Sequence, residues 1–162
     1  MRRWQVGALL VWLVMPVAAA STEAELGNMQ CVEVSIEQVG DEAQSVGLNE
    51  NTLSDWVVLA TKAKLPRLKI KETCPDVLLV HLNFLLGTYT DRQPAGQYSG
   101  SVELSVLRRV TVEATGKHSF LPVWYYSAIV FGPTKTAKKT VLNALEQLGG
   151  RFAADYYKAG NE

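Results

Sequence analysis

The segment SVELSVLRRVTVE, residues 101–113, alternates apolar and polar side chains over most of its length. Alternation with a period of two is typical of a strand that buries one face. Arg108 falls among the apolar positions, which indicates either a β-bulge or the rim of a sheet. A turn at residues 115–117 and the aromatic and β-branched residues 120–131 then predict a returning strand. The sequence therefore predicts a sheet built around one long hairpin.

The residues before this hairpin predict more of the same sheet and one helix. Asn49 is a good N-cap, an apolar stripe follows at helical spacing, and Pro66 ends the pattern, so a helix is expected over residues 49–65. Residues 67–71 carry three basic side chains in alternation, as on a charged edge strand. Further strands are predicted at residues 31–37 and 77–86, the second of them central because it is apolar on both sides.

A final helix is expected after Thr134, and Gly149 and Gly150 are expected to bend or split it. The element order predicts an α+β fold, a two-layer sandwich with a mostly antiparallel sheet of four to five strands and two helices on one face. The first strand and helix should cross over right-handed, which makes that strand parallel to a neighbour.

The N-terminus predicts export. A basic start, an apolar run of about 13 residues and small residues at 18–20 predict a signal peptide over residues 1–20, because the run is shorter than the ~20 residues that span a bilayer. Residues 21–30 are expected to be a flexible lead-in, and residues 31–160 a single α+β domain. The protein is thus expected to be periplasmic or secreted without stable membrane insertion, although the sequence leaves open whether the leader is kept as an anchor.

Composition and motifs favour a non-enzymatic protein. The 162 residues hold 16 basic and 16 acidic side chains, so no global positive field is available for nucleic acid. No nucleophile elbow, P-loop or dinucleotide-binding glycine motif occurs. His81 and His118 lack the paired spacing of zinc ligands, so neither a metal nor a cofactor is expected. An unrecognised hydrolase would need a pocket that gathers one of these histidines with an acid and a nucleophile.

The two cysteines, Cys31 and Cys74, are expected to form a structural disulfide. An exported chain meets an oxidising compartment, and an even number of cysteines favours pairing. A redox role would prefer closely spaced cysteines, which are absent.

Two groups of residues are candidate binding sites. The first is aromatic and would contact a partner protein, although packing beneath the final helix is the alternative: Trp124, Tyr125, Tyr126 and Tyr157. The second is basic and would bind an anionic ligand or a lipid surface, although a solvated helix end is the alternative: Lys62, Lys64, Arg67, Lys69 and Lys71.

The chain resembles uncharacterised small exported bacterial α+β proteins, in which Gly47-Leu48-Asn49 opens the first helix and an aromatic run at 151–157 ends the last. Its element order is similar to that of periplasmic accessory modules such as the N-terminal domain of TolB and the lipoprotein activators of cell-wall synthases. The resemblance implies a non-enzymatic binding or assembly module for an envelope partner and transfers no functional residue. Binding of a small anionic ligand or a lipid surface by the basic segment is the alternative, and the partner and the oligomeric state are left open.

Overall fold

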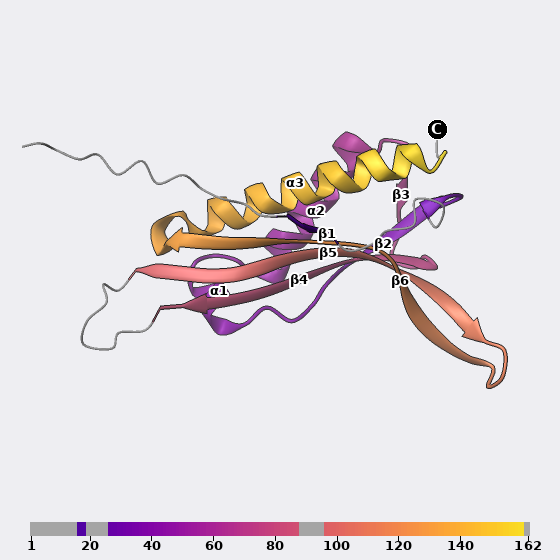
Figure 1. The fold of residues 1–162 in the computed structure, drawn as a ribbon, viewed down its shortest axis with the longest axis horizontal. Helices are drawn as coiled ribbons and strands as arrows, with labels where there is room; N and C mark the ends of the chain where they lie inside the picture. Colours follow the sequence, from indigo (N-terminus) through magenta and orange to yellow (C-terminus); the bar gives the residue numbers. More distant parts are fainter. Residues whose placement is uncertain (1–15, 19–25, 88–95, 161–162) are drawn as a thin grey trace, which may run out of the picture.

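The computed structural model describes residues 16–18, 26–87 and 96–160, and it contains a six-stranded sheet in the order β1-β6-β5-β4-β2-β3 (Figure 1). The sheet is built on the predicted hairpin, β5 (Gln97–Val112) and β6 (Lys117–Pro133), which pair antiparallel along their whole length. Gly116 has a φ of 65° in the turn that joins them, a conformation that favours glycine.

A β-bulge interrupts the hairpin where the sequence predicts a bulge or a rim. Val106 pairs with Trp124 and Leu107 with Pro122, so Val123 is the extra residue. Beyond the bulge, residues 107–122 form an arm that extends past the helices (Figure 1). Arg108 lies at the base of this arm, where its guanidinium Nε donates to Asp76 Oδ1 at 2.7 Å. Arg108 can therefore stand among apolar positions because its guanidinium pairs with the buried carboxylate of Asp76.

The remaining strands confirm the mixed topology. β4 (Asp76–Leu86) pairs antiparallel with β5, while β2 (Cys31–Ile36) runs parallel to β4 and to the short β3 (Lys69–Ile70). β1 (Pro16–Ala18) adds antiparallel to the other edge, at β6. β1 falls within the leader that the sequence predicts, and without it the sheet has five strands, within the four to five expected.

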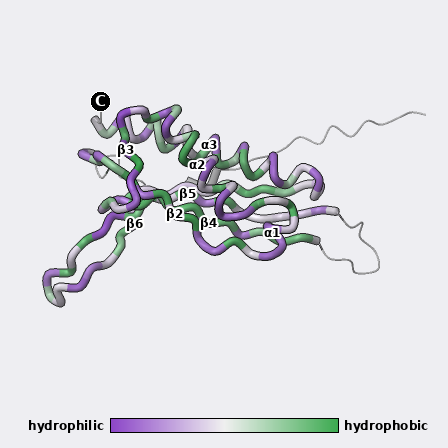
Figure 2. The backbone as a smooth tube through the Cα atoms, turned by 180° about the vertical axis from the view of Figure 1, so that it is seen from behind, coloured by the Kyte–Doolittle hydropathy of each residue, from purple (hydrophilic) through white to green (hydrophobic). Residues whose placement is uncertain are grey.

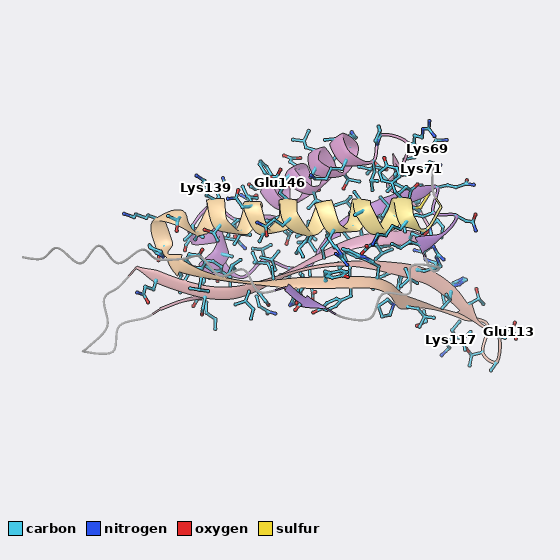
Figure 3. All side chains as sticks on the ribbon, turned by 45° about the horizontal axis from the view of Figure 1, so that its top comes forward. Lys69, Lys71, Glu113, Lys117, Lys139 and Glu146 are labelled. Atoms are coloured by element: carbon cyan, nitrogen blue, oxygen red, sulfur yellow. A yellow bond between two sulfur atoms is a disulfide. The ribbon has the colours of Figure 1, made fainter. Side chains whose placement is uncertain are left out.

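The two long helices lie side by side on one face of the sheet, as predicted (Figures 1 and 3). The first is α2 (Glu50–Lys64), where Asn49 caps the N-terminus by accepting from the Thr52 amide at 2.8 Å. The second is α3 (Ala137–Lys158), which follows a 3-10 turn, η2 (Thr134–Thr136). α3 runs without a break through Gly149 and Gly150, so the predicted split does not occur, because its apolar stripe is buried on both sides of them.

A short helix, α1 (Asp41–Ser45), was not expected from the sequence, in which residues 40–42 only end a strand. It lies against the end of β4, where Glu42 Oε2 accepts from the Leu86 amide at 2.6 Å. Leu26 and Met29 are also in the core, so the packed domain begins before Cys31 and includes part of the expected lead-in. Their burial is favoured because it removes large apolar side chains from water, and the Tyr156 hydroxyl on α3 donates to the Met29 carbonyl at 3.0 Å.

Candidate functional site

The consecutive aromatic residues of β6 divide between the two faces of the sheet. Trp124 is 1% exposed and Tyr126 8% exposed, and both pack in the core on the side of the helices. Trp124 contacts the ring of Phe152 on α3, with centroids 5.2 Å apart. Tyr125 points to the opposite face and is half-buried. Of the three, only Tyr125 is therefore available to a partner, and for the other two the core alternative describes their position.

A buried polar network explains how Trp124 and Tyr126 are fixed. Trp124 Nε1 donates to Asp155 Oδ2 at 3.1 Å, and Asp155 also pairs with Arg151 at 3.3 Å. Arg151 in turn donates to the Tyr126 hydroxyl at 3.1 Å and stacks on its ring. The hydrogen bond to Tyr126 and the Asp155 carboxylate raise the pKa of Arg151, so its charge is permanent. This network fastens α3 to β6 and is structural.

Tyr157 lies at the end of α3, where its hydroxyl donates to the Lys64 carbonyl at 3.1 Å. Its ring also meets Tyr156 edge-on, with centroids 5.7 Å apart. Tyr157 thus joins the ends of the two long helices, and although its side chain is exposed it lies apart from Tyr125. The aromatic residues proposed from the sequence do not form one surface.

The face of the sheet that α2 and α3 leave free carries apolar side chains that the sequence analysis did not select. Leu85 on β4 and Ile129 and Phe131 on β6 are 65%, 48% and 40% exposed. The register places Ser99 between Leu85 and Phe131, and Ser101 beside Ile129, so these side chains flank a row of small ones. We call Tyr125, Ile129, Phe131 and Leu85 the free-face cluster. The alternation of faces along a strand could have predicted this surface, because it places residues 129 and 131 on the face of Tyr125 and not on that of Trp124.

A polar and acidic row, His81, Glu103 and Ser127, crosses this face between Tyr125 and the other three members of the cluster. Nδ1 of His81 is hydrogen-bonded to the carboxylate of Glu37, and Glu103 lies opposite His81 on β5. Burial lowers the pKa of His81, but the Glu37 hydrogen bond and the two carboxylates outweigh it and raise the pKa above its ordinary value. An apolar cluster beside two carboxylates suits a partner surface that is apolar with a basic margin.

In the part of the chain that the structure describes, the side chain of His81 is hydrogen-bonded to the carboxylate of Glu37, and no hydrogen bond joins it to a hydroxyl group. Ser127 shares the row of His81, but β5 lies between their strands, which puts them about 10 Å apart. His118 lies on the arm, where Thr111 is its hydrogen-bond partner at 3.2 Å. A groove of about 390 Å³ runs between α2 and the edge of the sheet, and neither histidine lines it.

The basic segment lies at the C-terminal end of α2 and along β3, and Lys69 and Lys71 sit together at this end of the molecule (Figure 3). Lys71 lines the groove just described, but Glu33 and Glu72 line it as well. These carboxylates oppose binding of an anion there. The other members of the segment are exposed or half-buried, as on a solvated helix end: Lys62, Lys64, Arg67 and Lys69.

Cys31 and Cys74 are joined by a disulfide, which ties the start of β2 to the residue before the turn into β4. Among the residues that the structure describes, no group of three or more His, Cys, Asp or Glu side chains could hold a metal ion. Within the same residues, none of the helices has the length and apolar content to cross a membrane.

No protein-family model and no curated protein matches the sequence. Among solved structures it is similar to a minor lipoprotein from Acinetobacter baumannii, with 5% identity, 80% of this chain and 92% of that chain covered, and a TM-score of 0.40. The rare lipoprotein B from Shewanella oneidensis gives 13% identity, 80% and 92% coverage and a TM-score of 0.32. An uncharacterized lipoprotein B from Nitrosomonas europaea gives 7% identity, with 85% of this chain and 88% of that chain covered and a TM-score of 0.30. Similarity this low transfers no residue role, and it does not confirm the resemblance to TolB.

Proposed function

We propose that this protein is exported and acts, without catalysis, as a binding module for an envelope partner protein. The observation that carries the proposal is the free-face cluster, which holds three large exposed apolar side chains on long paired strands. Apolar side chains grouped on a surface favour contact with another protein, and a paired sheet holds them in fixed positions. Export rests on the predicted signal peptide and is supported by the disulfide, which an oxidising compartment maintains.

The partner should present an apolar patch with basic residues at its margin. The cluster supplies the apolar centre, while Glu37 and Glu103 supply negative charge beside it. In a protein interface the apolar centre contributes most of the affinity, and the charges at the margin affect the rate of association and the choice of partner. Binding through this face is therefore expected to depend only weakly on salt.

The experiment is crosslinking in the producing cell, followed by capture of the protein and identification of what is attached. Phe131→Ser and Ile129→Ser should abolish one reproducible crosslinked partner. Leu59→Ser is the matched control, because Leu59 is 65% exposed on α2 and lies outside the cluster. Capture that survives both β6 substitutions, or that Leu59→Ser removes equally, would contradict the proposal.

The second candidate, an anion or lipid-surface binder at the basic segment, has weaker support because Glu33 and Glu72 share its groove. It makes a different prediction: binding should fall steeply with added salt and should be lost in Lys69→Glu. A captured partner that depends on Lys69 and not on Phe131 would favour this second candidate.

A further inference from the structure

The edges of the sheet differ in how they are protected from pairing with another strand. Unpaired edge strands attract further strands, and proteins block them with short strands, charged side chains or a covering element. β3 is only two residues long, and it carries Lys69 between Arg67 and Lys71. α1 covers the end of β4 that extends beyond β2, where Glu42 Oε2 accepts a hydrogen bond from the Leu86 amide. The β3 edge is thus short and charged, and α1 covers the far end of β4, while the part of β2 beyond Val32 borders the groove beside α2.

In the part of the chain that the structure describes, the edge at β6 is long and uncharged, and the three-residue β1 is the strand that pairs with it. β6 is 17 residues long, and from Ser119 to Pro133 it contains no Asp, Glu, Lys or Arg. Proline is also absent between Val123 and Phe131, so each amide of that stretch that points away from β5 can donate to a further strand. Figure 2 shows the long paired strands of the sheet from behind, coloured by the hydropathy of each residue. A long uncharged edge of this kind is suited to accept a strand.

The structure contains a strand at this edge. β1 pairs antiparallel with β6 in the register Pro16 to Ala128, Val17 to Ser127 and Ala18 to Tyr126. These three residues lie in the predicted leader, before the predicted cleavage after Ala20. Removal of the leader would therefore leave the main-chain groups of residues 126–128 without their neighbour strand.

We propose that the mature protein binds an extended segment of its partner by strand addition at the β6 edge, and that the leader occupies this edge only until it is cleaved. This inference rests on the proposed function and specifies its binding mode. The bound segment is uncharged and antiparallel to β6, with small residues at the positions opposite Tyr126 and Ala128. Both positions lie on the face that α3 covers, which limits their size. The added strand would lie next to Tyr125 and Ile129, continuous with the free-face cluster.

The test uses the protein purified after export, once its N-terminal residue has been determined, and a synthetic peptide of residues 13–20 with lysines added for solubility. The peptide should bind and should slow hydrogen exchange at those amides of residues 126–128 that point away from β5. Two N-methylated analogues supply the control, one modified at Val17 and one at Ala18. Alternate amides of a strand point into the sheet, so one analogue should bind like the parent and the other about tenfold more weakly or worse.

Four results would overturn the inference: an exported protein that retains residues 16–18, no protection of residues 126–128, equal binding of both analogues, or a dimer whose free form already protects these amides. The last result would assign the edge to a second copy of the chain. The test is separable from that of the proposed function. If the peptide fails while Phe131→Ser still loses the captured partner, strand addition is wrong and the binding module stands; the opposite result rejects the module.

Discussion

Replacing Trp124 by alanine should cost much of the stability of the domain, because this side chain belongs to the core. Its indole is 1% exposed, packs on Phe152 and donates to the buried Asp155. Truncation of a buried tryptophan costs about 3–5 kcal/mol. The whole free energy of unfolding of a typical domain is about 5–15 kcal/mol. Trp124→Phe keeps an aromatic ring but loses the N–H and part of the buried volume, so it should cost about 1–2 kcal/mol, less than the alanine substitution, and Arg151 still pairs with Asp155.

The measurement is urea unfolding followed by far-ultraviolet circular dichroism, which does not depend on the indole that is removed. Tyr125→Ala is the matched control, because Tyr125 is the next residue of the same strand and points to the other face. It should cost about 1 kcal/mol. If Trp124→Ala cost no more than Tyr125→Ala, the assignment of Trp124 to the core would be refuted. A loss of partner binding in Trp124→Ala would report unfolding and would say nothing about the interface.

Three further outcomes are expected. Reduction of the Cys31–Cys74 disulfide, whose sulfurs join residues 43 apart, should lower the free energy of unfolding by about 4 kcal/mol from loop entropy, as measured by urea unfolding with and without reductant. Asn49→Ala should cost about 1 kcal/mol by leaving the N-terminus of α2 uncapped, whereas Asn49→Asp should cost little; thermal unfolding of the two variants checks this. The raised pKa of His81 means that its pairing with Glu37 stabilises the fold fully below about pH 6.5, and that this contribution falls as the pH rises through the raised pKa. The effect should stay under about 1 kcal/mol because the pair is partly exposed, and it should be smaller in Glu37→Gln, where Glu103 remains. An NMR titration of wild-type His81 that shows no upward shift would contradict it.

Local patterns were sufficient for most of the elements. The alternation in residues 101–113 predicts β5, and the cap at Asn49 with the proline at 66 predicts α2 to within one residue at each end. Such signals lie within a few residues of the element they specify, so they can be read without knowledge of the rest of the chain. Continuity of α3 through Gly149 and Gly150 could not be read in this way, because packing along the whole helix outweighs the local propensity of two glycines.

The sequence by itself determined the α+β class, the hairpin and the pairing partners available to the two cysteines, because each depends on residue type and spacing along the chain. The tertiary structure alone decided which face of β6 the helices cover. That choice buries Trp124 and Tyr126, and it leaves Ile129 and Phe131 exposed although their residue types are just as apolar. It also decided that β6 follows the edge strand β1 in the sheet, so that β6 becomes the edge when β1 is removed. A strand has two faces and two edges, and only the elements that pack against it decide which face is buried and which edge is paired. An alternating sequence therefore predicts the strand without predicting which of its surfaces is exposed.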